Sequence, residues 1–108
     1  MTHESILNQL GYVPNLPLME QLGRIEANTV GFDKIIKHVM DLHEALKADK
    51  SYVAMSNTHD FLKIKIEGVS EVSKSDAREK IDHFSHKYKV KLEKVAGKDT
   101  YYILGFTA

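Results

Sequence analysis

The chain has 108 residues, enough for a single domain with one modest hydrophobic core. Its 15 Lys and Arg residues balance its 15 Asp and Glu residues, which argues against a dedicated duplex-DNA binder, because such proteins usually carry excess basic charge. The absence of cysteine excludes disulfides, thiolate metal sites and a cysteine nucleophile. Because the start lacks a signal-peptide pattern and no apolar run approaches the roughly 20 residues of a membrane span, we expect a soluble cytoplasmic protein without membrane contact.

Residues 1–31 are predicted to form a helical extension. Thr2 is a suitable N-cap for a short helix that runs to Leu10 with its apolar side chains on one face. Residues 12–17 contain both prolines of the chain and predict an irregular link. Residues 17–28 again place apolar side chains at helical spacing, so we expect a second helix there.

Residues 32–108 are predicted to form the core of the domain. Residues 32–48 carry apolar side chains on one wide stripe and charged side chains opposite, the period of a half-buried helix. A second amphipathic helix is predicted over residues 74–88, with its N-cap within residues 73–76. The predicted strands are residues 52–56, 61–67, 89–93 and 101–106.

This order of elements predicts an α+β fold of two layers, in which helices cover one side of a four-stranded antiparallel sheet. The alternation in residues 61–67 and 89–93 indicates one buried face and one solvated face. Each half of the core reads helix, strand, polar turn, strand, giving an αββαββ order with the N-terminal extension in front. The two halves have similar lengths, which either a duplication or chance would produce.

The outward face of the predicted sheet combines lysines with aromatic rings. On single-stranded nucleic-acid platforms, rings stack on bases while ammonium groups meet phosphates. Alternatively, lysines on a solvated strand face keep a protein soluble and discourage edge pairing, and Glu67 and Glu93 on the same face fit that interpretation. We expect one of the two adjacent tyrosines to join this face. The candidate residues for a nucleic-acid or partner-binding face are Phe61, Lys63, Lys65, Lys89, Lys91, Tyr101 and Tyr102.

The C-terminal strand is apolar on both of its sides. Strict alternation would place Tyr101, Ile103 and Gly105 on one side of it. A strand of this kind is either covered on both faces or meets another chain. Cover of its second face by the N-terminal helices and cover by a second copy of the chain explain this pattern equally well. The candidate self-association residues, on the other side, are Tyr102, Leu104 and Phe106.

The six histidines are scattered along the sequence. Glu79 and His83, and likewise Asp82 and His86, are four residues apart on a predicted helix. Two such pairs facing each other could bind a divalent metal, but the spacing is more typical of surface ion pairs, so these four residues are weak metal candidates only. His43 lies on the apolar stripe of its helix, which predicts a hydrogen-bonded residue at the edge of the core rather than a catalyst.

The glycines are never clustered into a phosphate-binding loop, and no Gly-x-Ser-x-Gly motif occurs. We therefore name no catalytic residue and no cofactor. We expect a non-enzymatic protein-interaction or regulatory module whose partner is another protein or a second copy of the chain. Single-stranded nucleic-acid binding is the alternative, and an enzyme built on the His–carboxylate helix is a third and weaker hypothesis.

Overall fold

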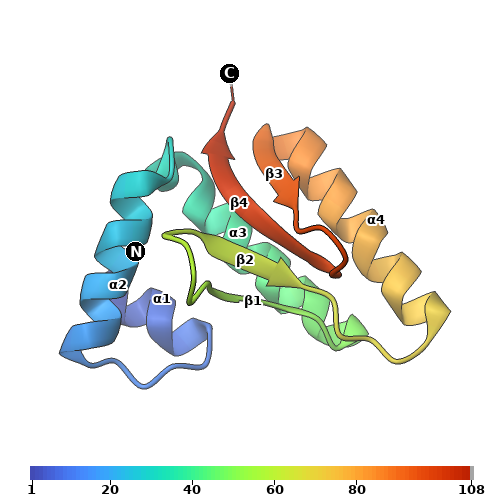
Figure 1. Ribbon diagram of the computed structural model, residues 1–108, viewed down its shortest axis with the longest axis horizontal. Coiled ribbons are helices and arrows are strands. Elements are labelled where there is room, and N and C mark those ends of the chain that lie inside the picture. The colour runs from blue at the N-terminus through green and yellow to red at the C-terminus, as the bar shows by residue number, and fades with distance from the viewer. Residues whose placement is uncertain (108) are drawn as a thin grey trace.

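The computed structural model describes residues 1–107, and it confirms the predicted α+β class with a four-stranded antiparallel sheet (Figure 1). The N-cap of the first helix is also as predicted, because Thr2 Oγ1 accepts a hydrogen bond from the backbone N–H of Ser5. The elements are α1 (His3–Gln9), α2 (Leu16–Asn28), α3 (Phe32–Leu46), the 3-10 turn η1 (Lys47–Asp49), β1 (Tyr52–Met55), β2 (Leu62–Lys65), α4 (Glu71–Tyr88), β3 (Val90–Lys94) and β4 (Thr100–Phe106).

The sheet has the strand order β1-β2-β4-β3, so that β2 and β4 form its centre. In Figure 1, α3 runs behind the sheet and α4 lies on the β3 side. The strand residues that face these helices pair across the sheet: Met55 with Leu62, and Leu62 with Ile103. All three are buried in the core cluster. Burial of each such aliphatic side chain contributes about 1.5–3 kcal/mol relative to leaving it in water.

The two N-terminal helices share this core. Ile6 and Leu7 of α1 and Leu22 and Ile25 of α2 are fully buried in the same cluster as the strand residues. Figure 1 places α1 and α2 beside the sheet, next to β1 and the loop that follows it, rather than across the sheet face. The hypothesis that these helices cover the second face of β4 is therefore wrong.

Helix α4 begins several residues before its predicted start. Its N-cap is Ser70, whose Oγ accepts a 3.1 Å hydrogen bond from the backbone N–H of Ser73, so the predicted cap within residues 73–76 is wrong. The first turn holds no core residue, and Val72 is 72% exposed. The apolar pattern of the sequence therefore does not reveal this turn, because none of its side chains lies in the core.

A β-bulge changes the register at the end of the sheet. Leu92 pairs with Ile103 but Lys91 pairs with Gly105, which leaves Leu104 as the extra residue. The next pair joins Phe106 to the buried Val90.

The bulge places Phe106 on the side of the sheet that the helices cover. Its ring packs against the core cluster, and the ammonium group of Lys34 lies 4.9 Å from the ring centroid. The prediction that Phe106 shares a face with Tyr102 is therefore wrong, because simple alternation along β4 does not survive the inserted residue.

Candidate interaction surface

The sheet face turned away from α3 and α4, called the open face below, carries a row of side chains that crosses all four strands. Ala54 pairs with Lys63, Lys63 with Tyr102, and Tyr102 with Glu93. Directly opposed residues of antiparallel strands place their side chains on the same face about 5 Å apart. We call these four residues the central row. The neighbouring row is formed by Tyr52, Lys65 and Thr100.

The open face holds only part of the predicted set of face residues. Lys63, Lys65 and Tyr102 lie in the two rows, and Lys91 lies farther along β3. The ring centroid of Phe61, just before β2, is 6.0 Å from that of Tyr102.

Two other members of the predicted set lie elsewhere. Tyr101 pairs with the buried Ile64 and packs on the core beneath the helices, so Tyr102 is the tyrosine that joins the open face. Lys89 is not in a strand, because it is the residue that ends α4. Its backbone is left-handed, with a φ of 55°, and among the non-glycine residues of the described chain only Lys50 shares this conformation.

The loop between β1 and β2 contacts the side chain of Tyr102. Its hydroxyl lies 3.3 Å from Thr58 Oγ1 and 3.1 Å from His59 Nδ1, and the rings of His59 and Tyr102 are 5.1 Å apart. Hydrogen bonds to loop hydroxyls, chiefly that of Thr58, hold the pKa of Tyr102 below its usual range. The positive charges of Lys63 and Lys98 lower this pKa further. The contact between His59 and Tyr102 joins residues 43 positions apart and leaves no pattern in the sequence.

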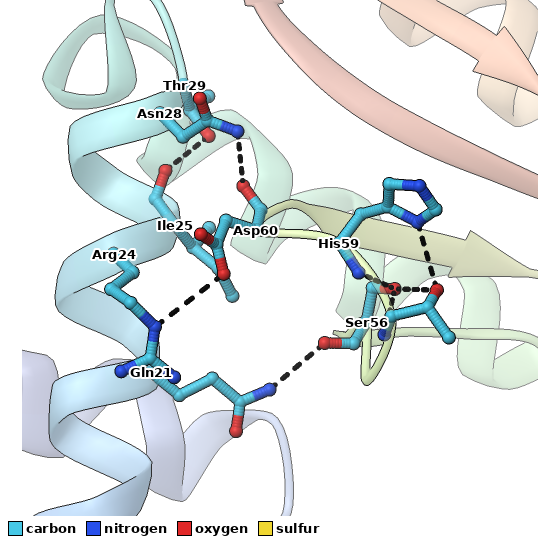
Figure 2. Close-up of polar contacts among 9 residues, drawn as sticks. Gln21, Arg24, Ile25, Asn28, Thr29, Ser56, His59 and Asp60 are labelled. Carbon is cyan, nitrogen blue, oxygen red and sulfur yellow. Dashed lines mark hydrogen bonds and ion pairs between the residues drawn. The ribbon is translucent and has the colours of Figure 1, made fainter.

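Helix α2 fixes the loop in turn (Figure 2). Gln21 Nε2 donates a 3.0 Å hydrogen bond to the backbone carbonyl of Ser56, and Asn28 Nδ2 donates a 3.1 Å bond to that of Asp60. Arg24 Nε lies 3.7 Å from Asp60 Oδ1, an exposed ion pair worth at most about 1 kcal/mol. These contacts tie both ends of the loop to one helix, so the aromatic residues on the open face have a defined arrangement.

The open face also contains a cleft of about 560 Å³. Three lysines, Lys63, Lys65 and Lys98, line it together with Tyr102. Lys65 is partly neutralised, because its ammonium group lies 3.1 Å from Glu67 Oε1. The hydrogen bond to this carboxylate raises the pKa of Lys65.

Side chains from outside the sheet cap the outer edge of β1. The backbone N–H of Val53 donates a 2.9 Å hydrogen bond to His43 Nδ1, and that of Met55 donates a 3.1 Å bond to the Tyr12 hydroxyl. Burial lowers the pKa of His43, and its side chain is hydrogen-bonded at the edge of the core, as predicted. With these N–H groups paired, β1 is a poor edge for pairing with another strand.

The histidines of α4 do not converge on a shared site. His86 Nδ1 lies 3.5 Å from Asp82 Oδ1, and both side chains are more than three-quarters exposed, which is the geometry of a surface ion pair. Glu79 and His83 instead line a shallow groove on α4. Within residues 1–107, no group of three or more metal-binding side chains lies close enough to hold an ion.

The described chain is thus a two-layer α+β protein with one sheet face covered by helices and one open. No protein-family model, curated protein or solved structure matches the sequence or the fold. No helix within residues 1–107 has the length and apolar character to cross a membrane.

Proposed function

We propose that this chain is a cytoplasmic, non-enzymatic protein-interaction module that self-associates through the open face of its sheet. The observation that carries the proposal is the half-exposed aromatic pair Phe61 and Tyr102 on a face that no helix of residues 1–107 crosses. Aromatic residues surrounded by charged ones are typical of protein interfaces, where they supply much of the binding energy.

The fixed arrangement of these rings favours binding. His59 and Thr58 contact the Tyr102 hydroxyl, and α2 holds the loop that carries them. Ordering a mobile side chain at an interface costs about 0.5–1.5 kcal/mol of conformational free energy. Side chains that are already held in place therefore pay a smaller entropy cost on association.

The edges of the sheet are less suited to association than its open face. The N–H groups of Val53 and Met55 on β1 are already bonded to His43 and Tyr12. The other edge strand, β3, carries exposed lysines, which natural proteins use to discourage strand pairing. Association through the face requires neither edge.

Sedimentation equilibrium over a wide concentration range tests the proposal. We expect the apparent mass to rise above the monomer value of 12.3 kDa with concentration, and Tyr102→Glu to hold it at that value. Val13→Glu is the matched control, because Val13 is 82% exposed on the link between α1 and α2 and should leave association unchanged. A wild-type protein that stays at 12.3 kDa throughout would refute self-association.

The lysine-lined cleft supports single-stranded nucleic-acid binding as a second candidate function. Its ammonium groups would meet phosphates, and the Tyr102 ring would stack on a base. It ranks second because Glu67 partly neutralises Lys65 and Glu93 lies next to Tyr102.

Titration with short single-stranded oligonucleotides at rising salt tests this second candidate. Binding should weaken as salt increases and should be lost in Lys63→Glu. Lys37→Glu makes the same charge change at an exposed position of α3, outside the sheet, and should bind normally. Absence of binding at low salt would eliminate this function.

A further inference from the structure

The central row is electrically asymmetric. Lys63 of β2 and Glu93 of β3 flank Tyr102 of β4 on its two sides, so positive charge, ring and negative charge follow one another across three neighbouring strands. Adjacent strands are about 4.8 Å apart, which places the two charged residues at similar distances from the tyrosine. None of the ion pairs within residues 1–107 involves either of them.

A symmetric dimer must bring the same patch of each copy together, so the patch has to be complementary to itself. Two sheets facing each other can be related by a two-fold axis that lies between them, either across the strands or along them. An axis across the strands would put Lys63 over Lys63 of the second copy. An axis parallel to β4 reverses the order of the strands and puts Lys63 over Glu93.

We propose that a second copy docks on the open face about a two-fold axis parallel to β4. This inference rests on the proposed self-association and adds its geometry. Each Lys63 then meets Glu93 of the other copy, and the two Tyr102 rings meet at the axis. The two sheets pack in the aligned manner: the two β4 strands run parallel to the axis, and the mean strand directions of the twisted sheets stay within about 30° of each other. The angle between the two sheets separates facing residues least where they lie near the axis, so the contacts of the central row are kept.

Charge reversal at these two positions tests the geometry. Lys63→Glu alone places two glutamates together at each contact, and Glu93→Lys alone places two lysines together. Like charges at an interface are strongly unfavourable, so each variant should dimerise at least about tenfold more weakly than the wild type. The double variant Lys63→Glu/Glu93→Lys restores both opposite-charge contacts and should dimerise again.

Mixing the two single variants gives an independent readout. One then carries only glutamates at the two positions and the other only lysines, so an equimolar mixture should form a heterodimer although neither variant dimerises alone. Lys37→Glu on α3 makes the same charge change away from the open face and should behave as the wild type. Far-UV circular dichroism of each variant establishes that the fold is retained.

The possible outcomes separate this inference from the proposed function. A monomeric wild type would overturn both. A dimeric wild type whose affinity is unchanged by either single reversal would leave self-association standing and overturn the two-fold geometry. Loss of dimerisation in the single variants without recovery in the double variant and the mixture would also overturn it, because the contact would then not join these two residues.

Discussion

His43 Nδ1 accepts a 2.9 Å hydrogen bond from the backbone N–H of Val53, and this bond joins helix α3 to the outer edge of the sheet. The nitrogen can accept only while the imidazole is neutral, because both ring nitrogens of a protonated imidazole are donors. The side chain is 4% exposed, and its burial favours the same neutral form. The contact therefore links the protonation of one side chain to the integrity of an edge strand.

This link predicts how stability depends on pH. Burial, and next the charge of Lys47, lower the pKa of His43 below 6.5 in the folded protein. Between the folded pKa and about 6.5 the unfolded chain binds the proton more readily, so the free energy of unfolding falls as pH is lowered through that window. Above about 6.5 the stabilisation is complete. Urea unfolding at a series of pH values measures the dependence.

The control variants isolate this histidine. In His43→Gln the side-chain oxygen can still accept from Val53 but cannot titrate, so the pH dependence in this window should become flatter. His86→Gln makes the same substitution at an exposed histidine of α4 and serves as the comparison. An identical slope in the wild type and His43→Gln would contradict the role assigned to His43.

The hydroxyl of Tyr12 makes the second contact with the β1 edge. Tyr12→Phe removes the acceptor for the N–H of Met55, and we expect a loss of about 1 kcal/mol in the free energy of unfolding. Hydrogen exchange of the Met55 amide should accelerate at the same time. Tyr52→Phe is the comparison, because its hydroxyl bonds only to the exposed Glu67 and should matter less. A Met55 amide as protected as in the wild type would argue against this capping role.

Gly105 is required by the close approach of residue Val30. A β-carbon at Gly105 would lie 2.6 Å from the carbonyl oxygen of Val30, and φ is +144° there. Gly105→Ala should therefore lower the free energy of unfolding by about 2 kcal/mol or more. Gly97→Ala also strains a positive φ, of +73°, but meets no atom within 4 Å, so thermal unfolding should show a smaller loss. Equal losses would mean that contact with Val30 is unimportant.

The carboxylate of Asp49 is 8% exposed and lies 2.7 Å from Lys80 Nζ, which joins η1 to α4. Lys80→Met leaves this carboxylate without its cation, and we expect it to cost about 1–3 kcal/mol of stability. Lys47→Met breaks the exposed pair with Glu44 and should cost less, because solvent screens an exposed pair. Chemical denaturation of both variants provides the comparison, and a smaller effect at Lys80 would contradict this assignment.

The sequence predicted the fold where a signal is local. Alternation of Leu62 and Ile64 with lysines identified the buried side of β2, because a period of two depends only on neighbouring residues. The bulge at Leu104 was not predictable in this way, since it arises where β4 meets β3 and where Gly105 meets Val30. Face assignments were therefore right for β2 and wrong for Phe106.

The candidate surface was predicted in part for the same reason. Lys63 and Lys65 follow from alternation, and one of two adjacent tyrosines had to face outward. The contact of His59 with Tyr102 joins residues 43 positions apart, and the clamp on the loop depends on α2, so neither leaves a pattern within one segment. Self-association and nucleic-acid binding both remain predictions.

Binding of a second copy through the open face is tested most directly by a nuclear Overhauser experiment filtered for contacts between copies. An equimolar mixture of ¹³C-labelled and unlabelled protein, at a concentration where sedimentation detects the dimer, reports only protons that lie close across the interface.

We predict intermolecular signals among Tyr102, Lys63 and Glu93, with the Tyr102 ring of one copy close to that of the other. Intermolecular signals confined to the helices, or to the edges of β1 and β3, would contradict binding through the open face.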